Sequence, residues 1–232
     1  MWATPSRWSA WTAGVPPAGL AAMGATVPAR MAGMDAEEWN ARYRDTGLVW
    51  SATPNQFVEA ELADLSPGRA VDLAAGEGRN ALWLARQGWQ VTAVDYARAG
   101  LDKGRTLAGD LDVDWVCADA TTWTHEPTFD LCLIAYLQLP SDERRAAVRN
   151  GYASVRVGGT FLLVAHDSTN LTEGTGGPQY AHVLLTAEDV LTDLGGETFE
   201  VQRAERVARE VPQPDGGTAT AYDALVRLVR RA

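Results

Sequence analysis

Short apolar runs alternate with longer segments of helical periodicity from residue 70 to residue 165 of this chain. Apolar runs separated by helices are typical of a parallel sheet that helices cover on both faces. We therefore predict an α/β fold built on a doubly wound, mostly parallel sheet. The runs that we expect to form strands are Ala70–Ala74, Gln90–Asp95, Val113–Cys117, Phe129–Tyr136 and Thr160–Ala165.

The C-terminal part of the chain follows a different pattern. Two long strands, residues 199–211 and 218–230, flank the turn sequence Pro-Asp-Gly-Gly at 214–217. This arrangement is typical of a β-hairpin, so the last strand should run antiparallel to the others. With the hairpin, the predicted Rossmann-like sheet has seven strands. The helices that we expect span residues 35–44, 54–64, 80–87, 97–108, 141–154 and 187–194.

Residues 1–33 differ in composition from everything after them. They are rich in Ala, Pro, Gly and Trp, and their charged residues are Arg7 and Arg30. Prolines interrupt any apolar stretch that would suit a signal peptide. We expect a disordered N-terminal extension over 1–33 and a single domain over 34–232.

The charge balance of the chain excludes some partners. It has 20 Lys and Arg against 30 Asp and Glu, which gives a formal net charge of -10. Such a surface repels phosphate backbones and anionic lipids, since binding either needs clustered cations. No apolar run approaches the roughly 20 residues that span a bilayer. We therefore expect neither a nucleic-acid partner nor a membrane.

The cysteines and histidines indicate no metal site. Cys117 and Cys132 show no C-x-x-C spacing and lie in apolar runs, so we interpret both as reduced core side chains. His125, His166 and His182 are too scattered to form a zinc set. A reducing, cytoplasmic location follows most simply from this pattern.

A glycine-containing loop follows the first predicted strand. The segment 72–80 reads D-L-A-A-G-E-G-R-N. Gly76 and Gly78 allow a tight turn and the close approach of a ligand, and the next helix directs its N-terminal amides toward that ligand. Open α/β sheets bind ligands at the carboxyl ends of their strands. We therefore predict the ligand site at this loop.

These residues alone are compatible with two classes of ligand. Gly76-x-Gly78-x-x-Ala81 also satisfies a dinucleotide pattern, so an NAD-dependent oxidoreductase is an alternative. Asp95 ends the second strand, where a carboxylate would accept both ribose hydroxyls in either case. Asp72 favours a ligand that presents a cation and an amine, because a buried carboxylate is poorly placed below a pyrophosphate. The other interpretation of Asp72 is a solvated acid at a strand end.

The same segment carries a specific resemblance. D-L-A-A-G-E-G-R-N, the apolar helix after it, Gly88 and V-T-A-V-D ending at Asp95 resemble motif I and the following acidic strand end of class I S-adenosylmethionine-dependent methyltransferases. The G-R-N at 78–80 is similar to the subgroup that includes the bacterial tellurite-resistance methyltransferases. Ala74 and Ala75 depart from the family, which usually has Gly and often Cys there.

The N-terminal part of the predicted domain adds to the likeness. Trp39-x-x-Arg42-Tyr43 and Val49-Trp50 resemble the helical lid segment of small-molecule methyltransferases in that subgroup. The resemblance covers residues 35–232 and is strongest over 70–96. It implies S-adenosylmethionine as the cofactor and methyl transfer to a small-molecule acceptor. A cofactor-binding member of the fold without catalytic activity is the other alternative.

The resemblance also implies a cofactor site. Asp95 would bind the ribose hydroxyls, and Tyr96 would cover one face of the adenine. Asp119 would accept from the adenine amine, or would instead cap the turn that follows it. Arg79 would pair with the cofactor carboxylate, or would be a surface arginine at the start of a helix. The implied cofactor residues are Tyr43, Trp50, Asp72, Ala74, Gly76, Gly78, Arg79, Asn80, Asp95, Tyr96, Asp119, Ala120 and Ala135.

The reacting side of the site lies after the fourth and fifth strands. Tyr136 and Gln138, then His166, Asp167 and Asn170, are the candidates there. We predict His166 as a general base, with Tyr136 as a second catalytic candidate, because imidazole exchanges protons near neutral pH. A hydrogen-bonded histidine at a strand end is the other interpretation. The glycine-containing loop 170–180 would cover the acceptor or be an ordinary connection.

The segment after the fourth strand points away from nucleic acid. It reads A-Y-L-Q-L-P at 135–140 and contains neither N-P-P-Y nor D-P-P-Y. Methyltransferases that act on the amino groups of DNA or RNA bases resemble one another in that tetrapeptide. The sequence therefore agrees with the acidic net charge in favouring a small-molecule acceptor.

Overall fold

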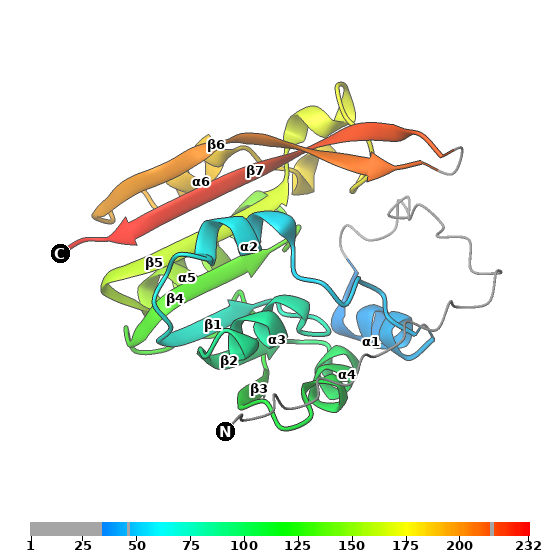
Figure 1. Ribbon diagram of the computed structural model, residues 1–232. Helices are drawn as coiled ribbons and strands as arrows, with labels where there is room; N and C mark the ends of the chain where they lie inside the picture. Colours follow the sequence, from blue (N-terminus) through cyan, green and yellow to red (C-terminus); the bar gives the residue numbers. More distant parts are fainter. Residues whose placement is uncertain (1–33, 46, 214–215) are drawn as a thin grey trace, which may run out of the picture.

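A computed structural model describes residues 34–45, 47–213 and 216–232. The predicted disordered extension over 1–33 lies outside the described residues, as do positions 214 and 215 of the predicted turn. Within the described part, seven strands form one sheet in the order β3-β2-β1-β4-β5-β7-β6. Helices pack on both faces of this sheet, which confirms the predicted doubly wound α/β fold (Figure 1).

The strands are β1 (Arg69–Leu73), β2 (Gln90–Asp95), β3 (Val113–Cys117), β4 (Phe129–Ala135), β5 (Val155–His166), β6 (Phe199–Pro212) and β7 (Thr218–Arg230). The α-helices are α1 (Ala36–Asp45), α2 (Gln56–Leu62), α3 (Arg79–Arg86), α4 (Arg98–Ala108), α5 (Ser141–Ser154) and α6 (Ala187–Asp193). Two 3-10 helices, η1 (Ser168–Leu171) and η2 (Ala181–Val183), follow β5.

The hairpin prediction is confirmed. Strands β1 to β5 pair in parallel, whereas β7 pairs antiparallel with both β5 and β6. Strand β7 thus inserts between β5 and β6, and β6 forms one edge of the sheet. In Figure 1 the turn end of the hairpin extends past the sheet on the side of α1. The topology therefore carries the end of β6 toward the carboxyl ends of the parallel strands.

Strand β5 begins earlier than we expected. We predicted a start at Thr160, but the strand starts at Val155, which pairs with Phe129. Gly159 lies inside a bulge, where a Cβ atom would stand 3.0 Å from the carbonyl oxygens of Phe129 and Asp130. Gly159 therefore allows a close approach between two strands.

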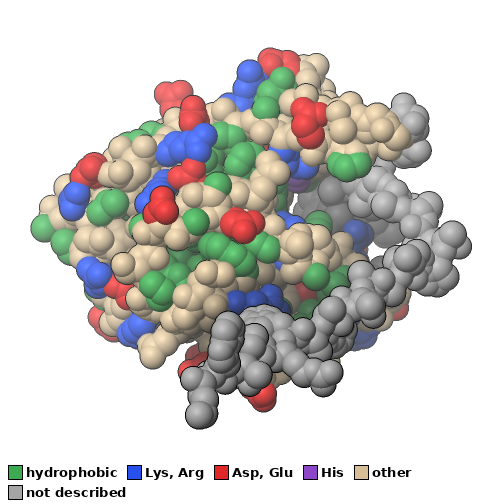
Figure 2. Space-filling model, viewed as in Figure 1, with side chains coloured by type: hydrophobic (Ala, Val, Ile, Leu, Met, Phe, Trp, Pro, Cys, Tyr) green, Lys and Arg blue, Asp and Glu red, His purple; other side chains and the backbone are tan. Residues whose placement is uncertain are grey.

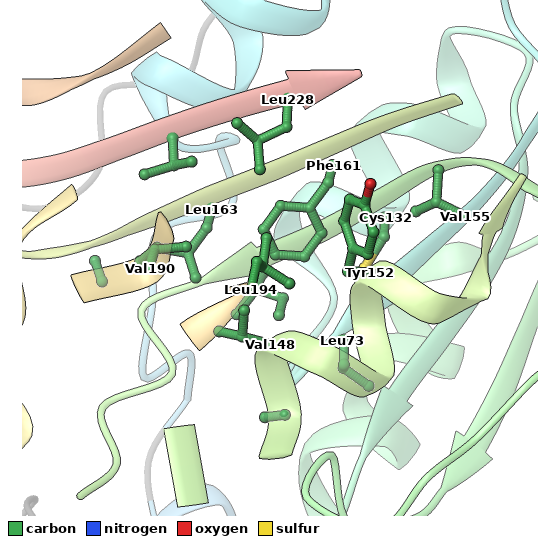
Figure 3. Packing of buried hydrophobic residues seen from close by; sticks show 14 of the residues in the cluster. Leu73, Cys132, Val148, Tyr152, Val155, Phe161, Leu163, Val190, Leu194 and Leu228 are labelled. Carbon is green, nitrogen blue, oxygen red and sulfur yellow. The ribbon is translucent and has the colours of Figure 1, made fainter. Parts of the chain in front are cut away.

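The core lies in two layers, one on each face of the sheet. Figure 3 shows the layer under α5 and α6, in which Tyr152, Phe161 and Leu163 pack against Val148 and Val190. Apolar residues of α2 and α3 form the layer on the other face. Because β4 and β5 lie between the layers, their side chains are buried on both faces, as the continuous apolar runs indicated.

Two local details differ from the sequence prediction. Helix α2 starts at Gln56 rather than at Pro54, because the Asn55 side chain accepts hydrogen bonds from the amides of Phe57 and Val58 and caps the helix. Cys117 is exposed, not buried, because β3 is the other edge of the sheet. Cys132 is buried, as we predicted.

Asp35 begins helix α1 with a reciprocal cap. Its carboxylate accepts from the amide of Glu38, and the Glu38 carboxylate accepts from the amide of Asp35. The helix packs against α4, which fixes it beside the carboxyl ends of β1 and β2. In the described part of the chain, no helix has the length and apolar character needed to cross a membrane.

Candidate active site

A cavity of about 780 Å³ opens at the carboxyl ends of the parallel strands. Its volume falls within the range of about 300–1,000 Å³ that is typical of ligand pockets. Figure 2 shows this face of the molecule hollowed between α1 and the turn end of the hairpin. The predicted site residues on its wall are Tyr43, Trp50, Ala74, Gly76, Arg79, Asn80, Asp95, Tyr96, Asp119, Ala135, Tyr136 and His166.

The loop after β1 has the backbone that its glycines predict. Ala74, Gly76 and Gly78 all have positive φ, at 67°, 59° and 77°. Such a φ costs free energy at Ala74, and strain of this kind concentrates at ligand sites. A Cβ atom on Gly76 would lie 2.7 Å from the Tyr43 hydroxyl oxygen. Gly76 therefore lets helix α1 approach the loop closely.

Gly78 has a different role from the one the resemblance implied. It does not line the cavity, and a Cβ atom on it would lie 2.5 Å from the Trp115 ring. Gly78 therefore lets the loop pack against β3, and the structure does not bring it to the ligand side. Ala120 is also buried behind the wall, away from the cavity surface.

Asp95 is positioned at the base of the cavity by two backbone amides. Its Oδ2 accepts from the Gly76 amide at 2.8 Å, and its Oδ1 accepts from the Ala97 amide at 2.7 Å. Burial raises the pKa of this carboxyl to about 6, against the lowering effect of both amides. A carboxylate has about four acceptor positions, so Asp95 keeps acceptor capacity for a pair of hydroxyls.

Asp72 is not brought to the cavity, contrary to its implied cofactor contact. Its side chain is fully buried beneath α3, where Oδ2 accepts from the Ala81 amide at 3.0 Å. Oδ1 has no hydrogen-bond partner among the described residues. Burial raises the pKa of the Asp72 carboxyl to about 7. Asp72 therefore holds the first turn of α3 in place, and neither sequence interpretation, cofactor contact or solvated acid, describes it.

We expect Asp72 to make stability depend on pH. Its pKa is near 3.8 in the unfolded chain and about 7 in the folded chain. Between these values the folded state holds a proton that the unfolded state has released, so the free energy of unfolding falls as pH rises. Asp72→Asn removes this contribution. Urea unfolding at several pH values should show the variant gaining stability relative to wild type from about pH 4 to about pH 7.

The effect of Asp95, whose pKa shifts in the same direction, is present in both proteins and cancels in this comparison. If the stabilities of the variant and wild type changed in parallel with pH, Asp72 would be ionised in the folded state.

Three aromatic side chains close the cavity on the α1 side. The ring centroid of Trp39 lies 5.5 Å from that of Tyr43 and 6.2 Å from that of Trp50, and the Trp50 indole donates to the Tyr43 hydroxyl. Glu77 fixes the loop by accepting from the backbone amides of Val49 and Trp50. Aromatic faces attract cations, so this wall suits a positively charged group such as a sulfonium.

Asp119 lines the cavity and also caps its own turn. Its Oδ1 accepts from the amide and the hydroxyl of Thr121 at 2.8 Å each. Oδ1 therefore caps the turn, as one of the two interpretations expected, and the residue also stands on the cavity wall. Tyr96 stands beside it and donates its hydroxyl proton to the Met34 carbonyl.

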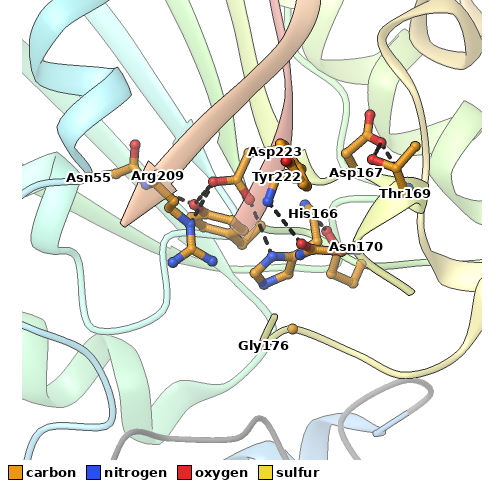
Figure 4. Close-up of polar contacts among 12 residues, drawn as sticks. Asn55, His166, Asp167, Thr169, Asn170, Gly176, Arg209, Tyr222 and Asp223 are labelled. Carbon is orange, nitrogen blue, oxygen red and sulfur yellow. Dashed lines mark hydrogen bonds and ion pairs between the residues drawn. The ribbon is translucent and has the colours of Figure 1, made fainter. Parts of the chain in front are cut away.

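The opposite wall is built around Asp223 of β7 (Figure 4). Its carboxylate is inaccessible to solvent, and its Oδ2 accepts from the Tyr136 hydroxyl at 2.9 Å and from Nε of Arg209 at 2.7 Å. The Asn55 amide donates to the Tyr136 oxygen at 3.1 Å. Burial and Asp223 hold the pKa of Tyr136 well above its usual range. Tyr136 therefore keeps its proton and is poorly suited as a base.

His166 faces the same carboxylate. Its Nδ1 lies 3.3 Å from Oδ1 of Asp223, although the two groups are not aligned as a hydrogen bond. Its backbone amide donates to the Gln138 side chain. The backbone of the 170–180 loop covers the ring, because a Cβ atom on Gly177 would stand 2.9 Å from it. With Nδ1 turned toward Asp223, Nε2 is the ring nitrogen that remains for an acceptor.

The other two candidates on this side are not at the cavity. Asp167 accepts from the amide and hydroxyl of Thr169 and caps η1. Asn170 is buried and its carbonyl oxygen accepts from the Tyr222 amide. These contacts tie the loop to β7, and Gly176, Gly177 and Pro178 of that loop line the cavity.

Several residues that build the site escaped the sequence interpretation. Asn55 and Glu77 position Tyr136 and the loop of Trp50, and Arg209 and Asp223 come from the hairpin. A polar residue just before a helix was a signal for Asn55. No local pattern marks Arg209 or Asp223, because both lie within long strands and reach the site only through the pairing of β7 with β5.

Comparisons with known proteins find a methyltransferase domain in this chain. A family model described as a methyltransferase domain matches residues 70–159, the part that contains the glycine loop, Asp95 and β4. Thiocyanate methyltransferase 1 of Brassica oleracea is 23% identical over 173 residues, which cover 71% of this chain and 75% of that protein. These similarities support a class I S-adenosylmethionine-dependent methyltransferase.

Solved structures share the fold of this methyltransferase. TehB from Haemophilus influenzae superposes with a TM-score of 0.63 at 18% identity, covering 84% of this chain and 67% of that one. The 1,6-didemethyltoxoflavin-N1-methyltransferase of Burkholderia thailandensis, solved with bound S-adenosylhomocysteine, has a TM-score of 0.62 at 21% identity and covers 85% and 87%. The family cofactor is S-adenosylmethionine. The aromatic wall suits its sulfonium, the glycine loop leaves room for its methionine part, and Asp95 can accept from its ribose hydroxyls.

Proposed function

We propose that this enzyme transfers the methyl group of S-adenosylmethionine to a small-molecule acceptor by in-line displacement. The observation that carries the proposal is a single cavity with two unlike walls. Gly76, Asp95 and Trp50 line one wall, and Tyr136, His166 and Arg209 line the other. One cavity can therefore hold a cofactor and an acceptor together, which is the arrangement that a direct transfer needs.

Each residue of the cofactor wall would bind a different part of S-adenosylmethionine. Asp95 would accept from the ribose hydroxyls, Tyr96 and Asp119 would bind the adenine, and Arg79 would pair with the carboxylate. Ala74, Asn80 and the carbonyl of Ala135 would border the methionine part, beneath Tyr43 and Trp50. When bound, the cofactor supplies a methyl group that its sulfonium already activates. The protein then has to align the acceptor and exclude water.

The acceptor wall would position the methyl acceptor and remove a proton from it where the reaction requires this. His166 would take a proton from the acceptor through Nε2 where the acceptor must lose one. Asp223 would hold the ring in orientation through Nδ1, as the carboxylate does in other His–Asp pairs. Tyr136 would form the floor between the two walls, with its hydroxyl proton donated to Asp223.

A small acceptor is supported by charge and by relatives. The net charge of -10 disfavours a nucleic-acid substrate. Thiocyanate methyltransferase and the 1,6-didemethyltoxoflavin-N1-methyltransferase are, by their names, enzymes of small acceptors. The absence of disulfide-type cysteine spacing supports a cytoplasmic location for this enzyme.

Binding and transfer experiments test this proposal. Calorimetry of the full chain with S-adenosylmethionine, S-adenosylhomocysteine and NAD should show binding of the first two and none of NAD. Incubation of a cell extract with methyl-labelled cofactor should then place label in the small-molecule fraction. Binding of NAD alone would support an oxidoreductase, binding without any transfer would support a non-catalytic member, and label in nucleic acid or protein would contradict a small acceptor.

Asp95→Ala should weaken cofactor binding. The substitution removes acceptors for the ribose hydroxyls and also leaves the Gly76 amide without its partner. We expect a loss of about 1–3 kcal/mol in the affinity for S-adenosylhomocysteine by calorimetry. Asp114→Ala on β3 is the control, because that carboxylate is exposed and away from the cavity wall. Equal affinity in Asp95→Ala and wild type would refute the ribose assignment.

A further inference from the structure

The acceptor wall contains a cation with no role in the cofactor assignments above. Arg209 lies on β6 and lines the cavity. Strand β6 stands four strands away from β1 in the sheet. At about 4.8 Å per strand this separates the β6 backbone from the glycine loop by about 19 Å. Arg209 therefore enters the cavity from the side opposite to the predicted cofactor site.

The guanidinium of Arg209 is held in one orientation. Its Nε donates to Oδ2 of Asp223 at 2.7 Å, and that carboxylate is itself fixed by the Tyr136 hydroxyl. Figure 4 shows the two terminal nitrogens turned away from Asp223. A guanidinium fixed through Nε presents its remaining nitrogens as a flat fork. Such a fork matches a planar oxyanion with two parallel hydrogen bonds.

The charges on the cavity wall are separated by sign. Four acids, Asp35, Asp95, Asp119 and Glu143, surround Tyr96 closely enough that they raise its pKa, after the larger effect of burial. They belong to the half of the cavity where a cationic cofactor is expected.

Two cations of the wall, Arg79 and Arg209, both lie near Tyr136, where the cofactor wall meets the acceptor wall. Arg79 lies 5.9 Å from the centre of the Tyr136 ring, and Arg209 is close enough to contribute, after burial, to lowering the pKa of Arg79. Two acids lie near Arg209. Asp223 is already bonded to Tyr136 and Arg209 and faces His166, and Glu210 is exposed, so that water screens its charge.

We propose that Arg209 binds a carboxylate or a comparable planar oxyanion of the methyl acceptor, so that the substrate is an organic acid. This inference rests on the proposed function. The acidic group would lie against the hairpin, and the reacting atom would lie between Tyr136 and the cofactor wall, beside His166. Arg209 would then recognise a group that is not consumed in the reaction. Its role would be specificity for the acceptor.

Matched pairs of an acid and its amide test this assignment directly. The full chain is saturated with S-adenosylhomocysteine and titrated by calorimetry with benzoate and benzamide, salicylate and salicylamide, and indole-3-acetate and indole-3-acetamide. We expect the acid to bind more tightly than its amide in at least one pair, by about 10- to 100-fold. Arg209→Gln should remove this preference, and Arg209→Lys should keep part of it, since lysine retains the charge without the fork.

Arg206→Gln is the matched control. Arg206 also lies on β6, but it pairs with Glu173, stacks over Tyr222 and does not line the cavity. We expect this variant to keep the acid preference of wild type. Both Gln variants should bind S-adenosylhomocysteine as wild type does, which shows that they are folded.

Three results would overturn the inference. These are no preference for the acid in any pair, an unchanged preference in Arg209→Gln, or a loss of S-adenosylhomocysteine affinity in that variant, which would place Arg209 on the cofactor. If Arg209→Gln does not fold, the wild-type pairs and Arg209→Lys decide. Failure of wild type to bind S-adenosylhomocysteine would instead contradict the proposed function.

Discussion

Replacing His166 with Ala is expected to lower kcat by about 10²- to 10⁴-fold, the usual contribution of a general base. The ring stands at the carboxyl end of β5 on the cavity wall, with Nδ1 near Asp223 and its faces packed against Tyr136 and the loop of Gly177. Tyr136, the other catalytic candidate, is held protonated and is therefore poorly suited to take a proton. The affinity for S-adenosylhomocysteine should stay unchanged, since His166 lies on the acceptor wall.

The measurement is steady-state methyl transfer to the acceptor found in the extract experiment, together with calorimetry. His125→Ala is the control, because His125 is exposed and lies before the amino end of β4, whereas His166 lies at the carboxyl end of β5. Asp223→Asn should lower kcat less than His166→Ala and should change the pH profile of kcat, since it alters the group that orients the ring. Equal turnover in His166→Ala and wild type would remove His166 from the mechanism.

Replacing Asp193 with Ala is expected to lower the free energy of unfolding by about 3–5 kcal/mol. Asp193 on α6 is buried and accepts from Nε of Arg144 on α5 at 2.6 Å and from its Nη2 at 3.3 Å. Arg144 is also buried. The substitution would leave a guanidinium inside the protein without its counter-ion, and this desolvated charge is the source of the loss.

Urea unfolding of both variants and wild type measures this effect. The exposed pair of Arg105 and Asp102 on α4 gives the matched control, since its N–O distance is also 2.6 Å. Asp102→Ala should cost only about 0–1 kcal/mol, because water solvates the arginine that remains. A loss in Asp193→Ala no larger than that in Asp102→Ala would mean that Arg144 reaches solvent when its partner is removed.

Local features of the chain made the cofactor half of the site predictable. The strand, the two glycines and the following helix occupy consecutive residues, so backbone geometry alone brings Gly76 beside Arg79 and Asn80. Asp95 ends the next strand, and parallel pairing with β1 places it at the same edge. Asp72 and Gly78 belong to the same segment, but its sequence pattern does not show which of its side chains face the cavity and which face the helix or β3.

The acceptor half depends on contacts between distant segments. Asn55 donates to Tyr136 across 81 residues, and Tyr136 donates to Asp223 across 87. Arg209 and Asp223 are only 14 residues apart, but they reach Tyr136 and the site because the hairpin pairs with β5. The sequence pattern of a strand does not predict which of its charged residues will line a cavity.

The sequence by itself determined the fold class, the order of strands and helices, the glycine loop and the acid at the end of β2. These follow from hydrophobic periodicity and backbone conformation, which act over a few neighbouring residues. Only the tertiary structure decided that Asp72 supports a helix, that Cys117 is exposed and that Arg209, Asp223 and His166 share one wall. Burial and side-chain pairing depend on which strands become neighbours, and that choice is made by packing over the whole chain.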